Sequence, residues 1–264
     1  MEKIVKAFFE KEKIEYFGSA KISERHIVIS RKLPEFAKYV TMFLVPYKNE
    51  PEKRNVSYYA VAKDYHYYTK EIEKSLRDQL EKNGITEKFR IFSDNSPFDE
   101  RKLACELHLG FIGENNLLIN EEYGSFVFLA ELVTEKNLDL SSGNGTQRSE
   151  CEKCNMCKKA CPTKFLDGKG TCMSEISQKK NLSDDEKELL KKHYLAWGCD
   201  ICQQVCPYNK RAKNSPIEFF SQDLLPYVTS DMIEKMDEKD FAKRAYAWRG
   251  KSVIMRNFDL TDIL

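Results

Sequence analysis

The cysteines are the residues of this sequence whose type and spacing can do chemistry. Eight of the nine lie between Cys151 and Cys206. The first four, with the proline after them, match C-x2-C-x2-C-x3-C-P, the run that binds [4Fe–4S] clusters in two-cluster ferredoxins. The second four form an opened version of this run, which also ends in C-x3-C-P. Two clusters with four thiolates each account for all eight.

In such runs the fourth cysteine ligates the other cluster. We therefore assign one cluster to Cys151, Cys154, Cys157 and Cys206. The second cluster is assigned to Cys161, Cys172, Cys199 and Cys202. Because each cluster draws on both halves of the run, the loss of one is expected to loosen the other.

Zinc and disulfides are the alternative uses of clustered cysteines. Structural zinc sites also use C-x2-C spacing, but they need neither a triple C-x2-C-x2-C run nor two C-x3-C-P ends. Disulfides are rare in a reducing cytoplasm. The ninth cysteine, Cys105, lies beside Leu103, Ala104 and Leu107 on a predicted helix, so we interpret it as a buried apolar thiol.

The region before Cys151 distinguishes between two hypotheses, an electron carrier and an enzyme. A cluster pair alone moves single electrons and would make the protein an electron carrier. A carrier does not need a large mixed α/β region ahead of its clusters, whereas an enzyme that passes electrons to a second cofactor does.

Five segments of the chain resemble one known family. Two lie in the cysteine region and read ACPTKFLDGKGTCMSEIS and WGCDICQQVCPYNK. The three before it read KDYHYYTKEIEKSL, SDNSPFDERKLACELHLGFIGENNLLI and YGSFVFLAEL. The three N-terminal segments occur in the order found in this family. Over roughly residues 40–210, the chain resembles the epoxyqueuosine reductases, which are cobalamin-dependent iron–sulfur enzymes of tRNA modification.

The resemblance implies a reaction and a proton donor. Family members hold cobalamin without a protein side chain on cobalt, reduce it through the adjacent clusters, and remove the epoxide oxygen of epoxyqueuosine in the tRNA anticodon. Their donor is the aspartate of a D-x-x-P-x-x-E-R segment, here Asp94. A carboxylic acid in a desolvated pocket can protonate a leaving oxygen. The alternative is that Asp94 only makes a turn ahead of Ser96.

The resemblance also implies residues near cobalamin. Tyr65 and His66 match the family's D-Y-H segment, although a histidine at a helix start can be a capping or packing group. Small residues of one loop would let the backbone approach the corrin ring. The residues expected near the cofactor are Tyr65, His66, Gly110, Gly113, Asn115 and Ser125. Ser125 could equally be a turn residue, and Glu114 departs from the family's usual lysine.

A basic and aromatic segment near the C-terminus is the candidate contact to RNA. Longer family members continue into helical repeats that help to hold tRNA, and this chain ends at Leu264. The segment AKRAYAWRGKSVIMR mixes cations with aromatic rings, which could contact phosphates and stack on bases of the anticodon stem-loop. The assigned residues are Arg249, Lys251 and Arg256. A helix with solvated charges and a buried tryptophan is the alternative.

The elements that must position these residues alternate between helix and strand through residue 135, which predicts an α+β fold. Apolar spacing predicts a helix over residues 2–16 and a buried strand at 40–47. Ser96 and Pro97 predict a helix start that leaves Asp94 in a loop. The further predictions are a helix over 64–84, a strand in KFRIFS, a hairpin around 121–124, a capped helix over 183–194 and helices from 215 onward.

The polar stretch NLDLSSGNGTQRSE predicts the main domain boundary. We expect an α/β cobalamin and substrate domain over 1–140, a ferredoxin-like double-cluster domain over 141–215 and a helical C-terminal segment over 216–264. The N-terminus lacks a secretory signal and no apolar run is long enough for a membrane span, so we expect a cytoplasmic monomer without membrane contact. The 43 basic and 42 acidic side chains nearly cancel, so any nucleic-acid binding must use local patches.

Other functions stay open at this stage. A related corrinoid reductase of a small molecule, as in reductive dehalogenases, is the second enzyme hypothesis, although the export signal usual in those enzymes is missing. An electron carrier and a corrinoid-reducing partner of another protein are the others. The tRNA hypothesis requires an external electron donor.

Overall fold

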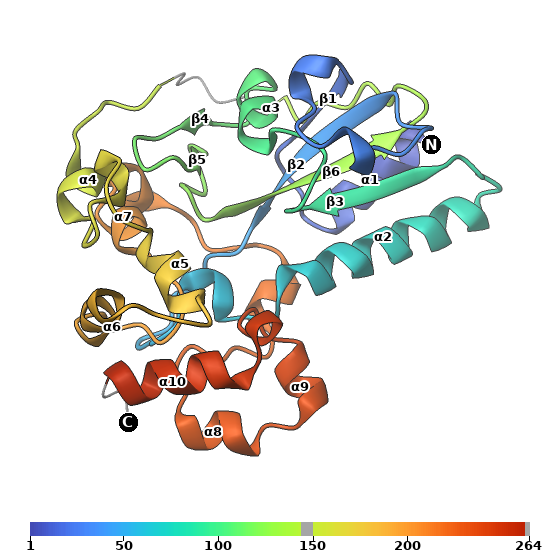
Figure 1. Ribbon diagram of the computed structural model, residues 1–264. Coiled ribbons are helices and arrows are strands. Elements are labelled where there is room, and N and C mark those ends of the chain that lie inside the picture. The colour runs from blue at the N-terminus through green and yellow to red at the C-terminus, as the bar shows by residue number, and fades with distance from the viewer. Residues whose placement is uncertain (144–149, 262–264) are drawn as a thin grey trace.

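Four antiparallel strands form the central sheet, in the order β1-β2-β6-β3. The computed structural model describes residues 1–143 and 150–261 (Figure 1). The strands are β1 (Phe17–Lys21), β2 (Tyr39–Pro46), β3 (Phe89–Ser93) and β6 (Val127–Thr134). Predictions of strands at 40–47 and in KFRIFS are confirmed by β2 and β3.

Both faces of the sheet are covered, and alternate residues of β2 point to opposite faces. On one face, Phe43 and Val45 pack with helices α1 (Glu2–Lys11) and α2 (Tyr65–Lys82). On the other face, Val40 and Met42 pack with helix α3 (Glu100–Glu106). Because both faces are buried, β2 is apolar along nearly its whole length, and the predicted α+β class is confirmed.

Two predicted helix ends differ from the structure. Helix α1 ends at Lys11 rather than at residue 16, because Lys13 takes a left-handed conformation with φ 56° and the chain turns into β1. Helix α3 begins three residues later than the Ser96–Pro97 signal predicted, with Asp99 as its N-cap. The Ser96 hydroxyl instead accepts a hydrogen bond from the N–H of Phe98 in the preceding turn.

The predicted hairpin around residues 121–124 is wrong. The segment before the turn forms β5 (Leu118–Ile119), which pairs with β4 (Phe111–Ile112) in a separate two-stranded sheet. Strand β6, which follows the turn, pairs with β2 and β3. Only Asn120 and Gly124 pair across the turn. The long apolar β6 therefore joins the main sheet, where it buries more surface than β5 could cover.

The cysteine region consists of short helices joined by loops. Ser183 and Glu186 form the predicted capping box at the start of α6, which ends at Lys191 rather than near 194. Figure 1 shows α4, α5, α6 and α7 together at one end of the molecule, on the same side as β4 and β5. The helices are α4 (Met156–Ala160), α5 (Met173–Gln178), α6 (Asp184–Lys191) and α7 (Ile201–Gln204).

The C-terminal segment is helical, as predicted, and packs into the body of the protein. Its helices are α8 (Ser230–Lys235), α9 (Glu238–Ala242) and α10 (Lys251–Thr261). Phe220 joins the core under α1 and α2, whereas Tyr246 and Ile254 pack with Val56 and Trp197. Segments on both sides of the boundary predicted after residue 215 thus share their cores.

Part of the predicted linker, residues 144–149, lies outside the described residues. In the described part of the chain, no helix is both long enough and apolar enough to cross a membrane.

Candidate functional site

The thiols of the first predicted cluster lie close enough to act on one another electrostatically. Burial raises the pKa of Cys206, and charges on Cys151 and Cys154 raise it further. Burial also raises the pKa of Cys157, to which Cys206 and Cys151 add. The structure therefore brings together the three closely spaced cysteines of the first run and the last cysteine of the second.

The remaining four cysteines form a second group beside the first. Burial raises the pKa of Cys199 to about 12, with Cys172 and Cys161 adding to the shift. Cys202 is raised to about 12 in the same way, with contributions from Cys199 and Cys172 and a smaller one from Cys157. The last contribution places the two groups next to each other.

The donor set fits two iron–sulfur clusters. All nine cysteines are free thiols, and the eight of the two groups lie in loops and on short helices from both halves of the run. Iron deprotonates a bound thiol, so a burial-raised thiol pKa would be reversed on cluster binding. Cys105 lies apart on α3 and is half-buried rather than buried as predicted; partial burial raises its pKa, and it packs against the core that includes Leu103 and Ala104.

A cavity of about 440 Å³ lies against the second cysteine group. Cys161, Cys172, Cys199 and Cys202 all line it. Its opposite wall comes from the N-terminal domain and is mainly apolar: Leu117, Val127 and Phe128 with Asn115 and Ser125. The cavity thus lies between the cysteine loops and the end of the main sheet at which β6 begins.

Asp94 lines a smaller hollow of about 240 Å³ that adjoins this cavity. The two hollows share five wall residues: Arg101, Leu117, Ser125, Val127 and Phe128. Tyr65 lines the smaller one with Asp94. The predicted proton donor and the second cysteine group therefore lie at two adjoining hollows that share a wall.

The loop that carries Asp94 is held in an uncommon conformation. Asp94 and Asn95 both have positive φ, 55° and 43°, which costs about 1 kcal/mol or more per residue outside glycine. The Tyr65 hydroxyl donates to Asp94 Oδ2 at 3.0 Å, and the Asp94 N–H donates to Glu100 Oε1 at 3.2 Å. Lys32 donates to the Asn95 carbonyl oxygen at 2.8 Å.

Tyr65 and His66 start helix α2, but they face different spaces. The Tyr65 ring stacks on Phe128 with centroids 4.0 Å apart, and burial raises its pKa, with Asp94 adding. Asp64 caps the helix and accepts from His66 Nδ1 at 2.7 Å, a hydrogen bond that raises the pKa of His66. His66 lines a third hollow on the far side of Asp94, not the cavity beside the cysteines.

The loop expected near cobalamin lines the cavity with Asn115, Asn116 and Leu117, and neither of its two glycines is a lining residue. A Cβ at Gly110 would lie 2.6 Å from the Ile119 carbonyl oxygen, and one at Gly113 would lie 2.7 Å from Ile119 Cδ1. Close β4–β5 packing therefore explains Gly110, and at Gly113 a Cβ would also lie 2.5 Å from Asn115 Oδ1. Asn115 does line the cavity; it is buried, and its Nδ2 has no hydrogen-bond partner among the described residues. A ligand carbonyl could satisfy this donor.

Ser125 joins the two domains at the cavity wall. Its N–H donates to Asn209 Oδ1 at 2.8 Å and its hydroxyl donates to Gln203 Oε1 at 3.0 Å. Asn209 Nδ2 donates back to Ser125 Oγ at 2.8 Å. Gly124 must be glycine here, because its φ is 59° and a Cβ would lie 2.2 Å from Asn209 Oδ1.

Comparison with known proteins identifies the family. Residues 150–209 match a family model described as a 4Fe-4S double cluster binding domain, which decides against the zinc alternative. Residues 29–95 match a model described as epoxyqueuosine reductase QueG. An epoxyqueuosine reductase of Cyclobacterium marinum is 35% identical over 244 residues, which cover 83% of this chain and 76% of the relative. The chain belongs to the epoxyqueuosine reductase family.

Two further relatives show how much of a family member's length this chain covers and how similar its fold is. The epoxyqueuosine reductase of Lactococcus garvieae is 33% identical over 80% of this chain, which spans 62% of that protein's length. A crystal structure of epoxyqueuosine reductase with an epoxyqueuosine-modified tRNA stem loop covers 98% of this chain and 80% of its own, with a TM-score of 0.72 and 23% identity. The second likeness concerns the fold.

Two features of this epoxyqueuosine reductase family member were not found from the sequence. Asp200, between Cys199 and Cys202, forms a buried ion pair with Arg54 at 2.7 Å and accepts from Ser57 Oγ at 2.5 Å. This contact fixes a cluster loop to the N-terminal domain. Buried Glu131 on β6 lies under the Asp94 loop. A glutamate within an apolar strand was a signal in the sequence that could have pointed to Glu131. No signal in the sequence indicated that Asp200 would pair with Arg54.

Glu114, the departure from the family's usual lysine, forms an ion pair with Lys158 of the cysteine region. Hydrogen bonding to Lys158 lowers the pKa of Glu114. The local charge is therefore balanced inside the molecule, between the β4–β5 loop and helix α4.

The three basic residues predicted to contact RNA differ in their availability. Arg256 donates to the Lys179 and Lys180 carbonyl oxygens at 2.7 and 3.0 Å. Lys251 donates to the Met236 carbonyl oxygen at 2.6 Å. Arg249 stacks 3.7 Å from the ring of Trp248, which is 61% exposed.

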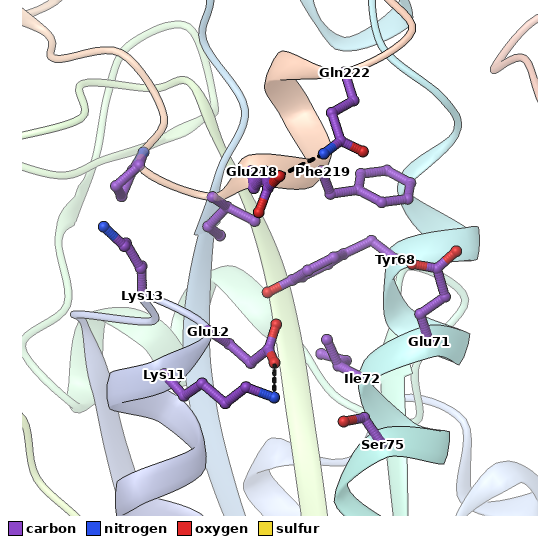
Figure 2. A pocket seen from close by; sticks show the side chains of 12 residues that line it. Lys11, Glu12, Lys13, Tyr68, Glu71, Ile72, Ser75, Glu218, Phe219 and Gln222 are labelled. Carbon is purple, nitrogen blue, oxygen red and sulfur yellow. Dashed lines mark hydrogen bonds and ion pairs between the residues drawn. The ribbon is translucent and has the colours of Figure 1, made fainter.

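A further hollow of about 430 Å³ lies between the C-terminal end of α1, the first half of α2 and residues 216–222. Figure 2 shows the Tyr68 hydroxyl pointing into it from α2, with Glu12 on one side and Glu218 on the other. Its described lining residues are not those of the Asp94 hollow or of the cysteine cavity, so we do not include it in the site.

Proposed function

We propose that this chain reduces epoxyqueuosine to queuosine in tRNA, with two [4Fe–4S] clusters and cobalamin as cofactors. The observation that carries the proposal is the pair of adjoining hollows, with four cysteines lining one and Asp94 lining the other. An electron carrier would not need a cavity beside its clusters, or an acid group in a hollow that adjoins this cavity.

The residues around the cavity fit a large cofactor with amide groups. The apolar wall offers Leu117, Val127 and Phe128, and the unpaired Asn115 Nδ2 is a donor for a carbonyl oxygen. When bound, the clusters supply single electrons and cobalamin supplies a strongly reducing, nucleophilic metal centre.

Asp94 is the proposed proton donor. Conversion of the epoxide to the alkene consumes two electrons and two protons, breaks both carbon–oxygen bonds and releases the oxygen as water. Asp94 donates a proton from its carboxyl group to the leaving oxygen. Tyr65 holds Asp94 Oδ2 through its hydroxyl, and its ring is fixed by stacking on Phe128, which lines both hollows.

We infer that tRNA is the substrate and that an external protein or small reductant delivers the electrons. A relative of the same fold has been crystallised with an epoxyqueuosine-modified stem loop. The exposed Trp248, with the partly buried Arg249 stacked on it, is the proposed contact outside the cavity, because a stacked guanidinium and indole can bind both bases and phosphates. The chain would act as a monomer in the cytoplasm, where its substrate is found.

The proposal is tested with anaerobically purified, cluster-reconstituted protein. We expect it to take up cobalamin and, with a strong reductant, to convert epoxyqueuosine to queuosine in tRNA, measured by mass spectrometry of digested nucleosides. Cobalamin uptake with no conversion would favour a small-molecule corrinoid reductase or a corrinoid-reducing partner. Neither uptake nor conversion would leave an electron carrier.

A further inference from the structure

Glu131 is an unusual side chain for its position. It lies in the middle of β6, opposite Met42 of β2 and Phe92 of β3, and it is 0% exposed. As acceptors, its two carboxylate oxygens receive no hydrogen bond of good geometry from a described residue, whereas the Glu100 carboxyl group lies close enough to share a proton with it. A buried carboxylate without a partner is strongly destabilising, so this side chain must be neutral or must share a proton with a neighbour.

Glu100 is that neighbour. Burial, followed by the charge of Glu100, raises the pKa of Glu131 well above its ordinary range. Burial and then the charge of Asp94 raise the pKa of Glu100 to about 7, and Arg101 opposes this shift. Glu131 is fully buried and Glu100 is partly buried beside it, so ionising both would place two negative charges side by side, and one proton remains on the pair until the pH exceeds the raised pKa values.

The side chains that surround Glu100 and Glu131 come from α2, α3, the loop before α3 and the two neighbouring strands. Helix α3 contributes Arg101, the loop before it contributes Asp94 and Ser96, and α2 contributes Tyr65, whose pKa Glu100 also raises. The neighbouring strands contribute only apolar side chains in register, Met42 and Phe92.

Glu100 also contacts the backbone of the proposed proton donor. Its Oε1 accepts the Asp94 N–H at 3.2 Å. Asp94 and Asn95 are both left-handed, so the loop needs fixed contacts to keep this conformation. An ionised or proton-sharing Glu100 is a stronger acceptor for an N–H than a neutral group.

We propose that Glu131 and Glu100 share one proton in the buried space below the Asp94 loop, and that this pair positions Asp94 for proton transfer. Glu131 donates to Glu100, which leaves Glu100 Oε1 to accept the Asp94 N–H. Both are positioning residues, and this inference rests on the proposed role of Asp94.

The first test does not require turnover. In cluster-loaded protein at a pH above the ordinary glutamate range, we expect an infrared carbonyl band of a protonated carboxylic acid that is lost in Glu131→Gln. Glutamine has the same shape and keeps a donor toward Glu100, so this variant should fold. Identical spectra of the wild type and Glu131→Gln would overturn the proposal.

The second test follows the loop itself. Glu131→Leu removes the donor, so we expect faster hydrogen exchange at the Asp94 amide, while Glu131→Gln exchanges as slowly as the wild type. Leu132→Val is the matched control, because it alters the next residue of β6, which faces α1 and α2, and should not change this exchange. Wild-type exchange in Glu131→Leu would overturn the proposal, and if this variant does not fold, the infrared test decides.

The third test measures the rate. We expect Glu131→Leu to lower single-turnover queuosine formation by about tenfold to a hundredfold, as misplacement of a catalytic group does, and Glu131→Gln to restore most of it. The affinity for tRNA should not change. If the wild type is active and Glu131→Leu has the full rate, the proposed role of the pair is wrong and the proposed function stands. If the wild type is inactive but shows the carboxylic acid band, the shared proton stands and the proposed function is wrong.

Discussion

Asp94 illustrates how backbone and side-chain contacts together present one acid. The loop is left-handed at two successive residues, and Tyr65, Glu100 and Lys32 each contact it from a different element. Aspartate and asparagine tolerate this backbone better than other non-glycine residues. The identity of residue 94 is therefore restricted by conformation as well as by chemistry.

We predict that Asp94→Asn retains both clusters and cobalamin but lowers queuosine formation by about a hundredfold or more, since the amide cannot donate an acid proton. The measurement is the rate of product formation with the visible spectrum of the loaded protein. Asp139→Asn is the matched control, because Asp139 is also exposed and left-handed, with φ 46°. Wild-type turnover in Asp94→Asn would remove this residue from the mechanism.

The buried acids predict a pH dependence of stability. The ordinary glutamate pKa of 4.5 is raised at Glu131 by burial and then by Glu100. As pH rises above 4.5, the unfolded chain loses this proton while the folded chain retains it, so stability falls. Relative to Glu131→Gln, the wild type should lose about 1.4 kcal/mol per pH unit, until Glu131 ionises in the folded state. Parallel urea midpoints of the two proteins across this range would contradict it.

At the scale of elements, the turn before β6 connects the sheet to the cysteine region. We predict that Gly124→Ala lowers the free energy of unfolding by about 2–4 kcal/mol, because it combines a positive-φ penalty with overpacking against Asn209. Gly84→Ala should cost only about 1 kcal/mol, since its φ is 68° but its Cβ would meet nothing within 4 Å. Urea unfolding of both variants measures the difference, and equal losses would show that the contact does not matter.

The crossed arrangement of the cysteine runs predicts coupled cluster loss. Cys206→Ser should remove more than about half of the iron, because the group that Cys206 completes adjoins the other group through Cys157 and Cys202. Cys105→Ser is the control and should retain all iron, since Cys105 lies apart on α3. Iron and sulfide analysis after anaerobic purification measures this, and an intact second cluster in Cys206→Ser would show independent sites.

Local signals in the sequence predicted individual elements well and their partners less well. The capping box at Ser183 and the continuous apolar run of β2 are both contained within a few residues, so both were predicted. The prediction that β5 and β6 form a hairpin was wrong, because strand pairing depends on strands elsewhere in the sequence, here β4 and β2. Asp94 was found through a resemblance, whereas its support by Glu131 depends on packing between β6 and α3, which short-range spacing does not encode.

At the scale of the whole molecule, one exposed patch is the candidate for the outer contact to tRNA. Arg249→Ala should weaken tRNA binding and reduce the slope of log affinity against log salt by about one, because one phosphate contact is lost. Titration at several salt concentrations measures this slope. Unchanged affinity would favour a solvated surface.

Arg256 is expected to behave differently. Because it donates to the Lys179 and Lys180 carbonyl oxygens, Arg256→Ala should lower the free energy of unfolding by about 1–3 kcal/mol and leave the salt slope unchanged. Unfolding curves and tRNA titrations of the same variant separate the two roles. A reduced slope without a loss of stability would assign Arg256 to RNA instead.

The contacts of residues 55–57 have a consequence for the order of assembly in the cell. Asn55 exchanges hydrogen bonds with Val228, and Ser57 binds both Trp197 and Asp200 beside the cysteines. The ribosome must release the chain beyond Val228 before this connection can close. Iron and sulfide delivered to the nascent chain earlier would meet loosely held thiols, so cluster insertion should follow synthesis rather than accompany it.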